Sequence, residues 1–254
     1  MIHYFTGKPG NGKSLHMAEI IYNEMKKGKN VIANFEINEE YFKDCKPEKI
    51  GKFIFMHNSY WLNNAYKGTT AHYKRTGRYN GPVIDINNYS YLDGLRNFAL
   101  MFHKRNDKGQ IIEKQTLLVI DECQELFNTR SWNRKDRLEW ASFFRQHRKY
   151  GYDVYLISQD DKVIDKQIRS ILQYEYEHRA LKYYKVFGKI LSFLCGGNLF
   201  VCIKRNYSMQ SKKDSHISSK YFKGKKKFYN FYDSYATFDT QGSQGVATAT
   251  DSLA

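Results

Sequence analysis

The chain opens on an apolar run, Ile2, Tyr4 and Phe5, and passes through a glycine-rich loop into an amphipathic stretch. Apolar residues recur there at helical spacing, and Gly28 stands where a C-terminal cap belongs. These apolar residues are Leu15, Ala18, Ile21, Tyr22 and Met25. The pattern predicts a strand, a loop and a helix.

Short apolar runs and longer helical patterns then alternate along the chain. Strands are predicted at 31–35, 53–56, 82–86, 116–120 and 153–158, and helices at 90–103, 135–150 and 163–172. In the second of these helices, Leu138, Ala141, Phe144 and His147 share one stripe, and Gly151 is expected to end it. This alternation indicates an α/β fold, a three-layer sandwich with a mainly parallel sheet. We expect its first strand and the 116–120 strand to be neighbours.

The glycine-rich loop, Gly7-Lys8-Pro9-Gly10-Asn11-Gly12-Lys13-Ser14, matches the phosphate-loop pattern G-x-x-x-x-G-K-[ST] at every fixed position. Its glycines allow backbone amides to approach a polyphosphate closely, and the following helix aims its N-terminus at the same anion. Lys13 is expected to reach the β- and γ-phosphates, and the Ser14 hydroxyl to ligate Mg²⁺. The predicted cofactors are therefore ATP and Mg²⁺, with residues 7–14 and Leu15 holding the nucleotide.

A second part of the same site is predicted where the 116–120 strand ends in Asp121 and Glu122. Consecutive apolar residues followed by carboxylates are typical of a parallel strand that delivers acids to the ligand-binding edge of a sheet. Asp121 is expected to hold the Mg²⁺ shell, and Glu122 to polarise the attacking water. Gln159, after the next strand, either hydrogen-bonds the γ-phosphate or its water, or is a plain polar strand end.

Composition adds charge and aromatic rings to this picture. The 254 residues carry a formal charge of +15, and 16% are aromatic, a balance that attracts nucleic acid, anionic lipid or acidic protein alike. Residues 58–80 are basic and tyrosine-rich, and they form either a surface for single-stranded nucleic acid or a solvated loop. The segment 174–236 is predicted to be a β-rich basic appendage, and 237–254 a flexible tail.

The cysteines, Cys45, Cys123, Cys195 and Cys202, have no C-x-x-C spacing and no accompanying histidine cluster. This argues against zinc, and the chain length argues against a disulfide framework, so a reducing cytosol fits best. The most apolar window, 186–203, is interrupted by Lys189 and Asn198 and is interpreted as strands rather than as a spanning helix. No signal peptide is expected ahead of the first strand.

Several segments resemble the filamentous-phage assembly ATPases of the zonular occludens toxin (Zot) family. They are Asp121-Glu122-Cys123 with 127–133, Arg148-Lys149 to Gln159-Asp160, Ile164-Asp165-Lys166-Gln167, and the aromatic, Asn/Asp-rich stretch 229–235. The resemblance covers roughly residues 1 to 235 and is densest from 116 to 170. It implies a RecA-like P-loop NTPase of the additional-strand, catalytic-glutamate type, with residues 1–173 as the ATPase domain.

The resemblance also implies site residues and partners. Lys13, Ser14, Asp121, Glu122 and Gln159 match the nucleotide site. Arg145 and Arg148 match a basic pair that we take as candidates for an arginine finger, with Arg130 in reserve. The implied work is extrusion of single-stranded phage DNA with coat-protein addition, at the cytoplasmic face of the host inner membrane. It would be done by a homo-oligomeric ring, such as a hexamer, with other phage export proteins.

Family members commonly continue into a transmembrane helix and an extracytoplasmic tail. This chain shows no such helix before Ala254, so we expect either that it is the cytoplasmic part alone or that it docks on the membrane through a partner.

Two other function classes are alternatives to a motor ATPase. A GTP-binding switch would need N-K-x-D, and the near match Asn133-Arg134-Lys135-Asp136 has its lysine displaced, so this class is discounted. A non-catalytic nucleic-acid-binding or assembly-scaffold protein stays open, since charge and aromatic loops suffice for it and the phosphate loop would then be vestigial.

Overall fold

The computed structural model describes residues 1–56, 58, 91–131, 137–184, 193, 198–209 and 214–232. Apart from Asn58, the insertion predicted at 58–80 lies outside the described residues, as do the strand predicted at 82–86 and the tail at 237–254.

One mixed sheet organises the molecule. Its strands lie in the order β3 (Phe53–Phe55), β2 (Asn30–Ala33), β4 (Thr116–Ile120), β5 (Tyr152–Ile157), β1 (Ile2–Thr6), β6 (Tyr174–Ala180), β7 (Leu199–Asn206) and β8 (His216–Lys223). The first six are parallel to their neighbours, whereas β7 and β8 join the sheet antiparallel. The predicted α/β fold with a mainly parallel sheet is confirmed.

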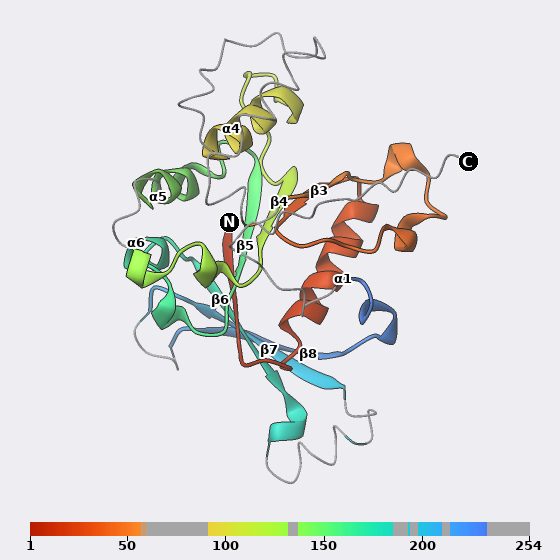
Figure 1. Ribbon diagram of the computed structural model, residues 1–254, viewed down its shortest axis with the longest axis vertical. Coiled ribbons are helices and arrows are strands. Elements are labelled where there is room, and N and C mark those ends of the chain that lie inside the picture. Colours follow the sequence, from red (N-terminus) through yellow and green to blue (C-terminus); the bar gives the residue numbers. More distant parts are fainter. Residues whose placement is uncertain are drawn as a thin grey trace, which may run out of the picture.

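Helices cover both faces of the sheet. The helix α1 (Lys13–Lys26) lies on one face, and α4 (Tyr91–Phe102), α5 (Arg137–Gln146) and α6 (Lys166–Arg169) lie on the other (Figure 1). Because side chains alternate along a strand, each central strand serves two cores. In β4, Leu117 and Val119 pack with the α1 core, and Leu118 and Ile120 pack with the core on the opposite face. The three layers therefore meet at strands that are buried on both faces, such as β1 and β4.

The predicted adjacency of β1 and β4 is wrong. Strand β5 lies between them, with Val154 paired to Ile2 on one side and to Leu118 on the other. Every residue of β5 except Tyr155 is buried, as a central strand requires. An apolar run shows that a strand is buried but not which strands flank it. A strand inserted at this place agrees with the additional-strand type that the family resemblance implies.

The β-rich segment expected after residue 173 contains β6, β7 and β8, and these strands continue the same sheet. Strand β6 pairs parallel with β1 directly, with Phe5 opposite Tyr176. The short segment that follows β8 then returns over the α1 face, where Phe228, Phe231 and Tyr232 are buried in its core. The C-terminal strands and this returning segment thus border the loop that β1 leads into.

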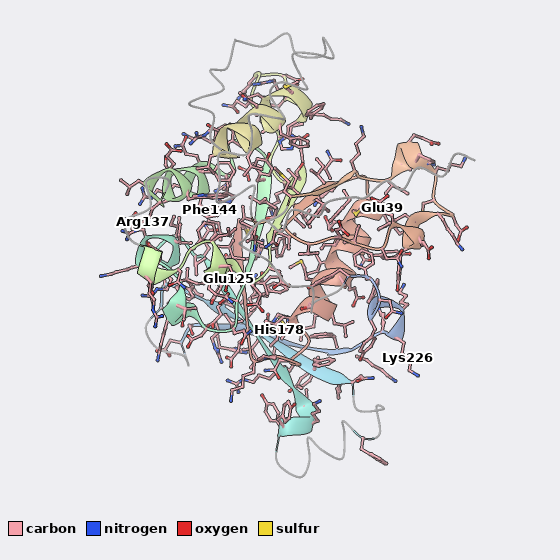
Figure 2. The ribbon with its side chains drawn as sticks, in the orientation of Figure 1. Glu39, Glu125, Arg137, Phe144, His178 and Lys226 are labelled. Atoms are coloured by element: carbon pink, nitrogen blue, oxygen red, sulfur yellow. The ribbon has the colours of Figure 1, made fainter. Side chains whose placement is uncertain are left out.

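Two helices differ from their predicted form. In α5 the buried stripe is Trp140, Ala141, Phe143 and Phe144, whereas Leu138 is 65% exposed because it faces outward in the first turn. Figure 2 shows Phe144 on the sheet side of this helix. The helix ends at Gln146, and Gly151 ends the turn that follows rather than the helix itself.

The helix predicted at 163–172 is shorter in the structure, where only α6, Lys166–Arg169, is α-helical. Asp165 caps it by accepting a hydrogen bond from the Gln167 amide, and Val163 lies in a preceding 3-10 turn. The side-chain cap starts the helix later than the apolar spacing suggests. No helix among the described residues has both the length and the apolar character that crossing a bilayer requires.

Candidate nucleotide-binding site

The glycine-rich loop lies between the end of β1 and the start of α1. Gly7, Gly10 and Gly12 have φ angles of 134°, 74° and 86°, in the region that favours glycine. A Cβ on Gly7 would lie 2.4 Å from the carbonyl oxygen of His178 on β6. Asn11 binds the same atom: its side-chain amide donates to the His178 carbonyl oxygen at 3.0 Å. The loop is therefore pressed against β6, and a side chain at position 7 would force them apart.

Lys13 is buried at the first position of α1. Its ammonium group donates to the Gly7 carbonyl at 2.5 Å and to the Lys8 carbonyl at 3.4 Å. Burial lowers the pKa of Lys13, while the charges of Asp121 and Glu122 act to raise it. The structure thus places Lys13 over the loop and within the electrostatic influence of both predicted carboxylates.

Asp121 is fixed at the end of β4 by its neighbours. Asn34, just after β2, accepts from the Asp121 amide at 2.8 Å and donates to the Asp121 carbonyl at 2.9 Å. The Glu122 amide donates to Asp121 Oδ1 at 2.9 Å. Burial raises the pKa of Asp121 to about 6, against the lowering effect of that amide bond. A buried carboxylate of this kind gains from a cation beside it.

Tyr232 joins the two predicted Mg²⁺ ligands. Its hydroxyl donates to Asp121 Oδ2 at 3.3 Å, and the nearby Ser14 side chain acts to lower the pKa of the same hydroxyl. The ring stacks on Phe35, with centroids 4.2 Å apart, which restricts the position of the hydroxyl. Burial holds the pKa of Tyr232 well above its usual value, so the phenol stays neutral. Ser14 and Asp121, which are remote in sequence, therefore line the same cleft together with Tyr232.

Glu122 adopts a left-handed backbone, with φ 45° and ψ 47°. Such a conformation is uncommon for a residue other than glycine and concentrates at functional sites. Its carboxylate accepts from the Gln124 side-chain amide on one oxygen and from Gln159 Nε2 at 3.3 Å on the other. Gln159 can reach it because β5 lies beside β4. The strand that breaks the predicted order is thus the strand that brings Gln159 to the glutamate.

These residues surround a cleft of about 540 Å³. It is lined by the phosphate-loop residues 9–15, by Asp121, Glu122 and Gln159, and by Phe200, Phe228, Tyr229, Asn230 and Tyr232. The polar groups of this cleft include the loop amides, the ammonium group of Lys13 and the carboxylates of Asp121 and Glu122. The hydroxyl and carboxylate oxygens of Ser14 and Asp121 are ligands of the kind that Mg²⁺ prefers, so the donor set fits that ion.

Residues 1–239 match the model of the family described as zonular occludens toxin (Zot). The chain belongs to the Zot family. Its sequence is 34% identical over 138 residues to the gene 1 protein of Enterobacteria phage fd, covering 52% of this chain and 40% of that protein. It is 28% identical over 201 residues to the gene 1 protein of Enterobacteria phage I2-2, covering 78% of this chain and 46% of that protein. The chain thus spans less than half the length of these relatives.

A solved structure carries the same fold. The crystal structure of the N-terminal domain of zonular occludens toxin from Neisseria meningitidis superposes with a TM-score of 0.50 at 17% identity. The match covers 91% of this chain and 98% of that one. At this level of identity the likeness concerns the fold, and it agrees with the P-loop NTPase architecture of the Zot-family chain described above.

A larger cleft, of about 860 Å³, lies on the β6 side of the same loop. Gly7 and Lys8, both expected at the nucleotide, line this second cleft rather than the first. Its walls also carry four carboxylates, Asp160, Asp161, Glu175 and Glu177. Arg179 and Arg205 pair with Glu177, but the other carboxylates still disfavour a polyphosphate, so the smaller cleft, which contains Lys13 and Ser14, is the better candidate for a nucleotide.

Two of the three candidate arginines, Arg145 and Arg148, lie apart from their own chain's cleft. Arg148 is exposed and makes a two-pronged contact with Glu113, at 2.9 and 3.1 Å, near the start of β4. Arg145 is exposed near the end of α5, shortly before β5 begins. The cleft is at the opposite edge, where these parallel strands end. Arg130 is exposed on the cleft side of β4, in the short helix Thr129–Ser131. In cis, neither Arg145 nor Arg148 belongs to the nucleotide site.

Sequence reasoning missed three residues of this site. Asn34 and Gln124 are polar residues without any motif, and they act through contacts with Asp121 and Glu122. Tyr232 lies in the aromatic stretch that resembles the family, so its presence was visible but its partners were not. A contact across 111 residues has no local signal in the sequence.

Proposed function

We propose that this Zot-family chain is an Mg²⁺-dependent ATP hydrolase that powers assembly and export of filamentous phage. The observation that carries the proposal is the convergence of Lys13, Ser14, Asp121 and Glu122 on one cleft. The family resemblance and the phage gene 1 relatives support the biological setting.

Each residue has a distinct role in the proposed reaction. The loop amides and Lys13 bind the β- and γ-phosphates, for which Lys13 exchanges its contact with the Gly7 carbonyl for phosphate oxygens. Ser14 and Asp121 would hold Mg²⁺, which supplies charge neutralisation between the phosphates. Glu122 accepts the hydrogen bond of the attacking water and polarises it. Gln159, already bound to Glu122, positions that water or the γ-phosphate.

The remaining parts of the proposal concern assembly. We place the nucleotide at the border between two copies of the chain in a closed ring such as a hexamer, with Arg145, Arg148 or Arg130 of one copy completing the site of the next. The ring would act at the cytoplasmic face of the host inner membrane. Its partners there would be single-stranded phage DNA, coat proteins and other phage export proteins.

The test is ATP hydrolysis with and without single-stranded DNA, in parallel with DNA binding at several salt concentrations. For a motor we expect turnover that DNA stimulates, and DNA affinity that changes with the bound nucleotide. DNA affinity should also fall steeply with salt, because basic side chains release counterions from phosphates. DNA binding that ignores nucleotide, with no hydrolysis at any protein concentration, would establish the non-catalytic scaffold instead.

A further inference from the structure

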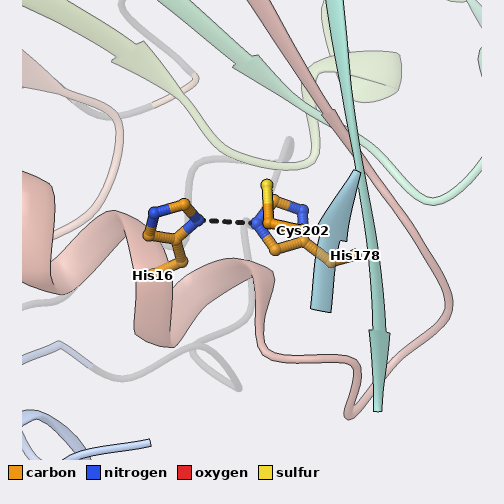
Figure 3. Close-up of side chains that lie close together, drawn as sticks. All are labelled: His16, His178 and Cys202. Carbon is orange, nitrogen blue, oxygen red and sulfur yellow. Dashed lines mark hydrogen bonds between the residues drawn. The ribbon is translucent and has the colours of Figure 1, made fainter. Parts of the chain in front are cut away.

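Three side chains with metal-binding atoms meet behind the phosphate loop. His16 comes from α1, His178 from β6 and Cys202 from β7 (Figure 3). Their ligand atoms all lie within 4.8 Å of one another, and His16 Nδ1 is 2.8 Å from His178 Nε2. None of the three takes part in the nucleotide chemistry proposed above.

A backbone contact sets the tautomer of His178. Its Nδ1 is 2.9 Å from the carbonyl oxygen of Tyr176, and a carbonyl can only accept, so Nδ1 carries the proton. Nε2 therefore presents a lone pair toward His16 and Cys202. Metal-bound histidines typically donate their second ring N–H to a carbonyl or carboxylate in this way, which fixes the ring and directs the ligand atom.

The fold holds the other two ligands in place. Cys202 lies directly opposite His178 in the antiparallel β6–β7 pair. Phe222 packs on the His16 ring with centroids 4.8 Å apart, and Phe5 packs on the His178 ring at the same distance. His178 and Cys202 are buried. The cluster is thus enclosed by aromatic rings that restrict its movement.

A small tetrahedral ion requires shifts in both directions, because the ligand atoms now lie between 2.8 Å and at most 4.8 Å from one another. Bonds of about 2.0 Å to nitrogen and 2.3 Å to sulfur put neighbouring ligand atoms roughly 3.3–3.6 Å apart. His16 and His178 need to part by about half an ångström from their 2.8 Å hydrogen bond to reach that spacing. The proton on His16 Nδ1 would move to Nε2, and the Cys202 thiol would lose its proton to solvent.

We propose that His16, His178 and Cys202 form a Zn²⁺ site, with water as the fourth ligand. A thiolate and two neutral imidazoles favour Zn²⁺ over Mg²⁺, which prefers oxygen ligands, so this site differs in chemistry from the one at Ser14 and Asp121. The ion would join α1 to β6 and β7. The ion would also stabilise the phosphate loop, because the carbonyl of its ligand residue His178 accepts a hydrogen bond from the loop residue Asn11.

The surrounding charges are mixed. Lys13 and Lys220 oppose a cation at the cluster, Lys220 lying opposite Cys202 on β8. Glu19, one turn after His16 on α1, favours it. The thiolate formed on binding supplies the further negative charge, which is why the cysteine is essential to the proposal.

The test is titration of the chelator-treated full chain with Co²⁺, followed by competition with Zn²⁺. We expect one ion per chain, a thiolate-to-cobalt charge-transfer band, and displacement by Zn²⁺. Cys202→Ser should abolish the band, and His16→Ala should weaken Zn²⁺ binding by at least about 100-fold. Cys123→Ser, which removes a buried thiol elsewhere, should retain both the band and the affinity.

Circular dichroism of each variant verifies that it has folded. A folded parent that yields no charge-transfer band, or a band that survives in folded Cys202→Ser, would overturn the proposal and leave the cluster as a hydrogen-bonded part of the core. The readout requires no ATP turnover, so this result stands apart from any failure of the proposed hydrolase.

Discussion

At the scale of a single residue, the stability of the fold and the proposed chemistry place opposite demands on Asp121. As a buried carboxylate it costs stability in the absence of a cation, yet the proposed chemistry needs its charge. In the folded chain its pKa is raised from 3.8 to about 6 by burial, a difference that corresponds to about 3 kcal/mol. A carboxyl with a raised folded pKa stabilises the fold below its unfolded pKa, and this contribution is lost as pH rises through about 6.

We therefore expect Asp121→Asn to stabilise the chain in EDTA at pH 7.5, by up to about 3 kcal/mol, while it weakens Mg²⁺-dependent hydrolysis. The measurement is urea unfolding of parent and variant at pH 7.5 and again at pH 4, where the difference should largely disappear. An equal difference at both pH values would show that the charge of Asp121 is not its cause.

At the scale of elements, the returning segment 225–232 both packs on α1 and lines the cleft. Its short helix Lys226–Phe228 lies near α1, and Lys225 pairs with Glu19 of that helix. Phe231 is fully buried against Tyr22, Tyr41 and Phe42. The segment closes one wall of the cleft while it completes the α1 core. Stability and nucleotide binding are consequently coupled through it.

Phe231→Ala should lower the free energy of unfolding by about 3–5 kcal/mol, because it empties a filled core position. Urea denaturation measures this loss, and Tyr183→Ala, at a side chain 69% exposed, is the control with little expected change. A loss below 1 kcal/mol for Phe231→Ala would mean that the segment does not pack on α1 as described.

The elements also show what a sequence can reveal. The phosphate loop, the Asp121 strand and the flanking helices carry local signals, namely fixed glycines, apolar runs and helical spacing, and the structure contains them. Strand order has no such signal, so the position of β5 was missed. Contacts between distant segments were missed for the same reason, among them Tyr232 with Asp121 and His16 with His178. The cysteine spacing gives no sign of the proposed zinc site, because His16, His178 and Cys202 come from three separate elements.

At the scale of the whole molecule, the exposed arginines distant from the cleft support the proposed ring. Arg148 cannot reach its own nucleotide, and its partner Glu113 is itself half exposed, so the pair is available to a second copy. The acidic second cleft beside the loop also contrasts with a chain of net charge +15. Both features suit contacts between copies of the chain.

Turnover per chain should then rise with protein concentration, and Arg148→Ala should lower it by about 10³-fold or more without weakening nucleotide binding. Lys149→Ala removes the neighbouring exposed charge and is the matched control. Mixing inactive Arg148→Ala with inactive Lys13→Ala should restore part of the turnover. In mixed rings some subunit interfaces then combine an intact Arg148 from one copy with an intact Lys13 in the phosphate loop of the next. Turnover independent of concentration, with no recovery on mixing, would contradict a shared site.

The central claim is that Glu122 activates water for ATP hydrolysis in this cleft, and a Glu122→Gln variant tests it most directly. The substitution keeps the shape and leaves Lys13, Ser14 and Asp121 intact, so we expect unchanged Mg²⁺-ATP affinity with turnover reduced by about 10²-fold or more. Glu125→Gln changes an exposed glutamate at the end of the short helix Cys123–Glu125, which begins just after Glu122, and should hydrolyse ATP like the parent. Undiminished hydrolysis by Glu122→Gln would contradict the account, whereas bound ATP that persists unhydrolysed would support it.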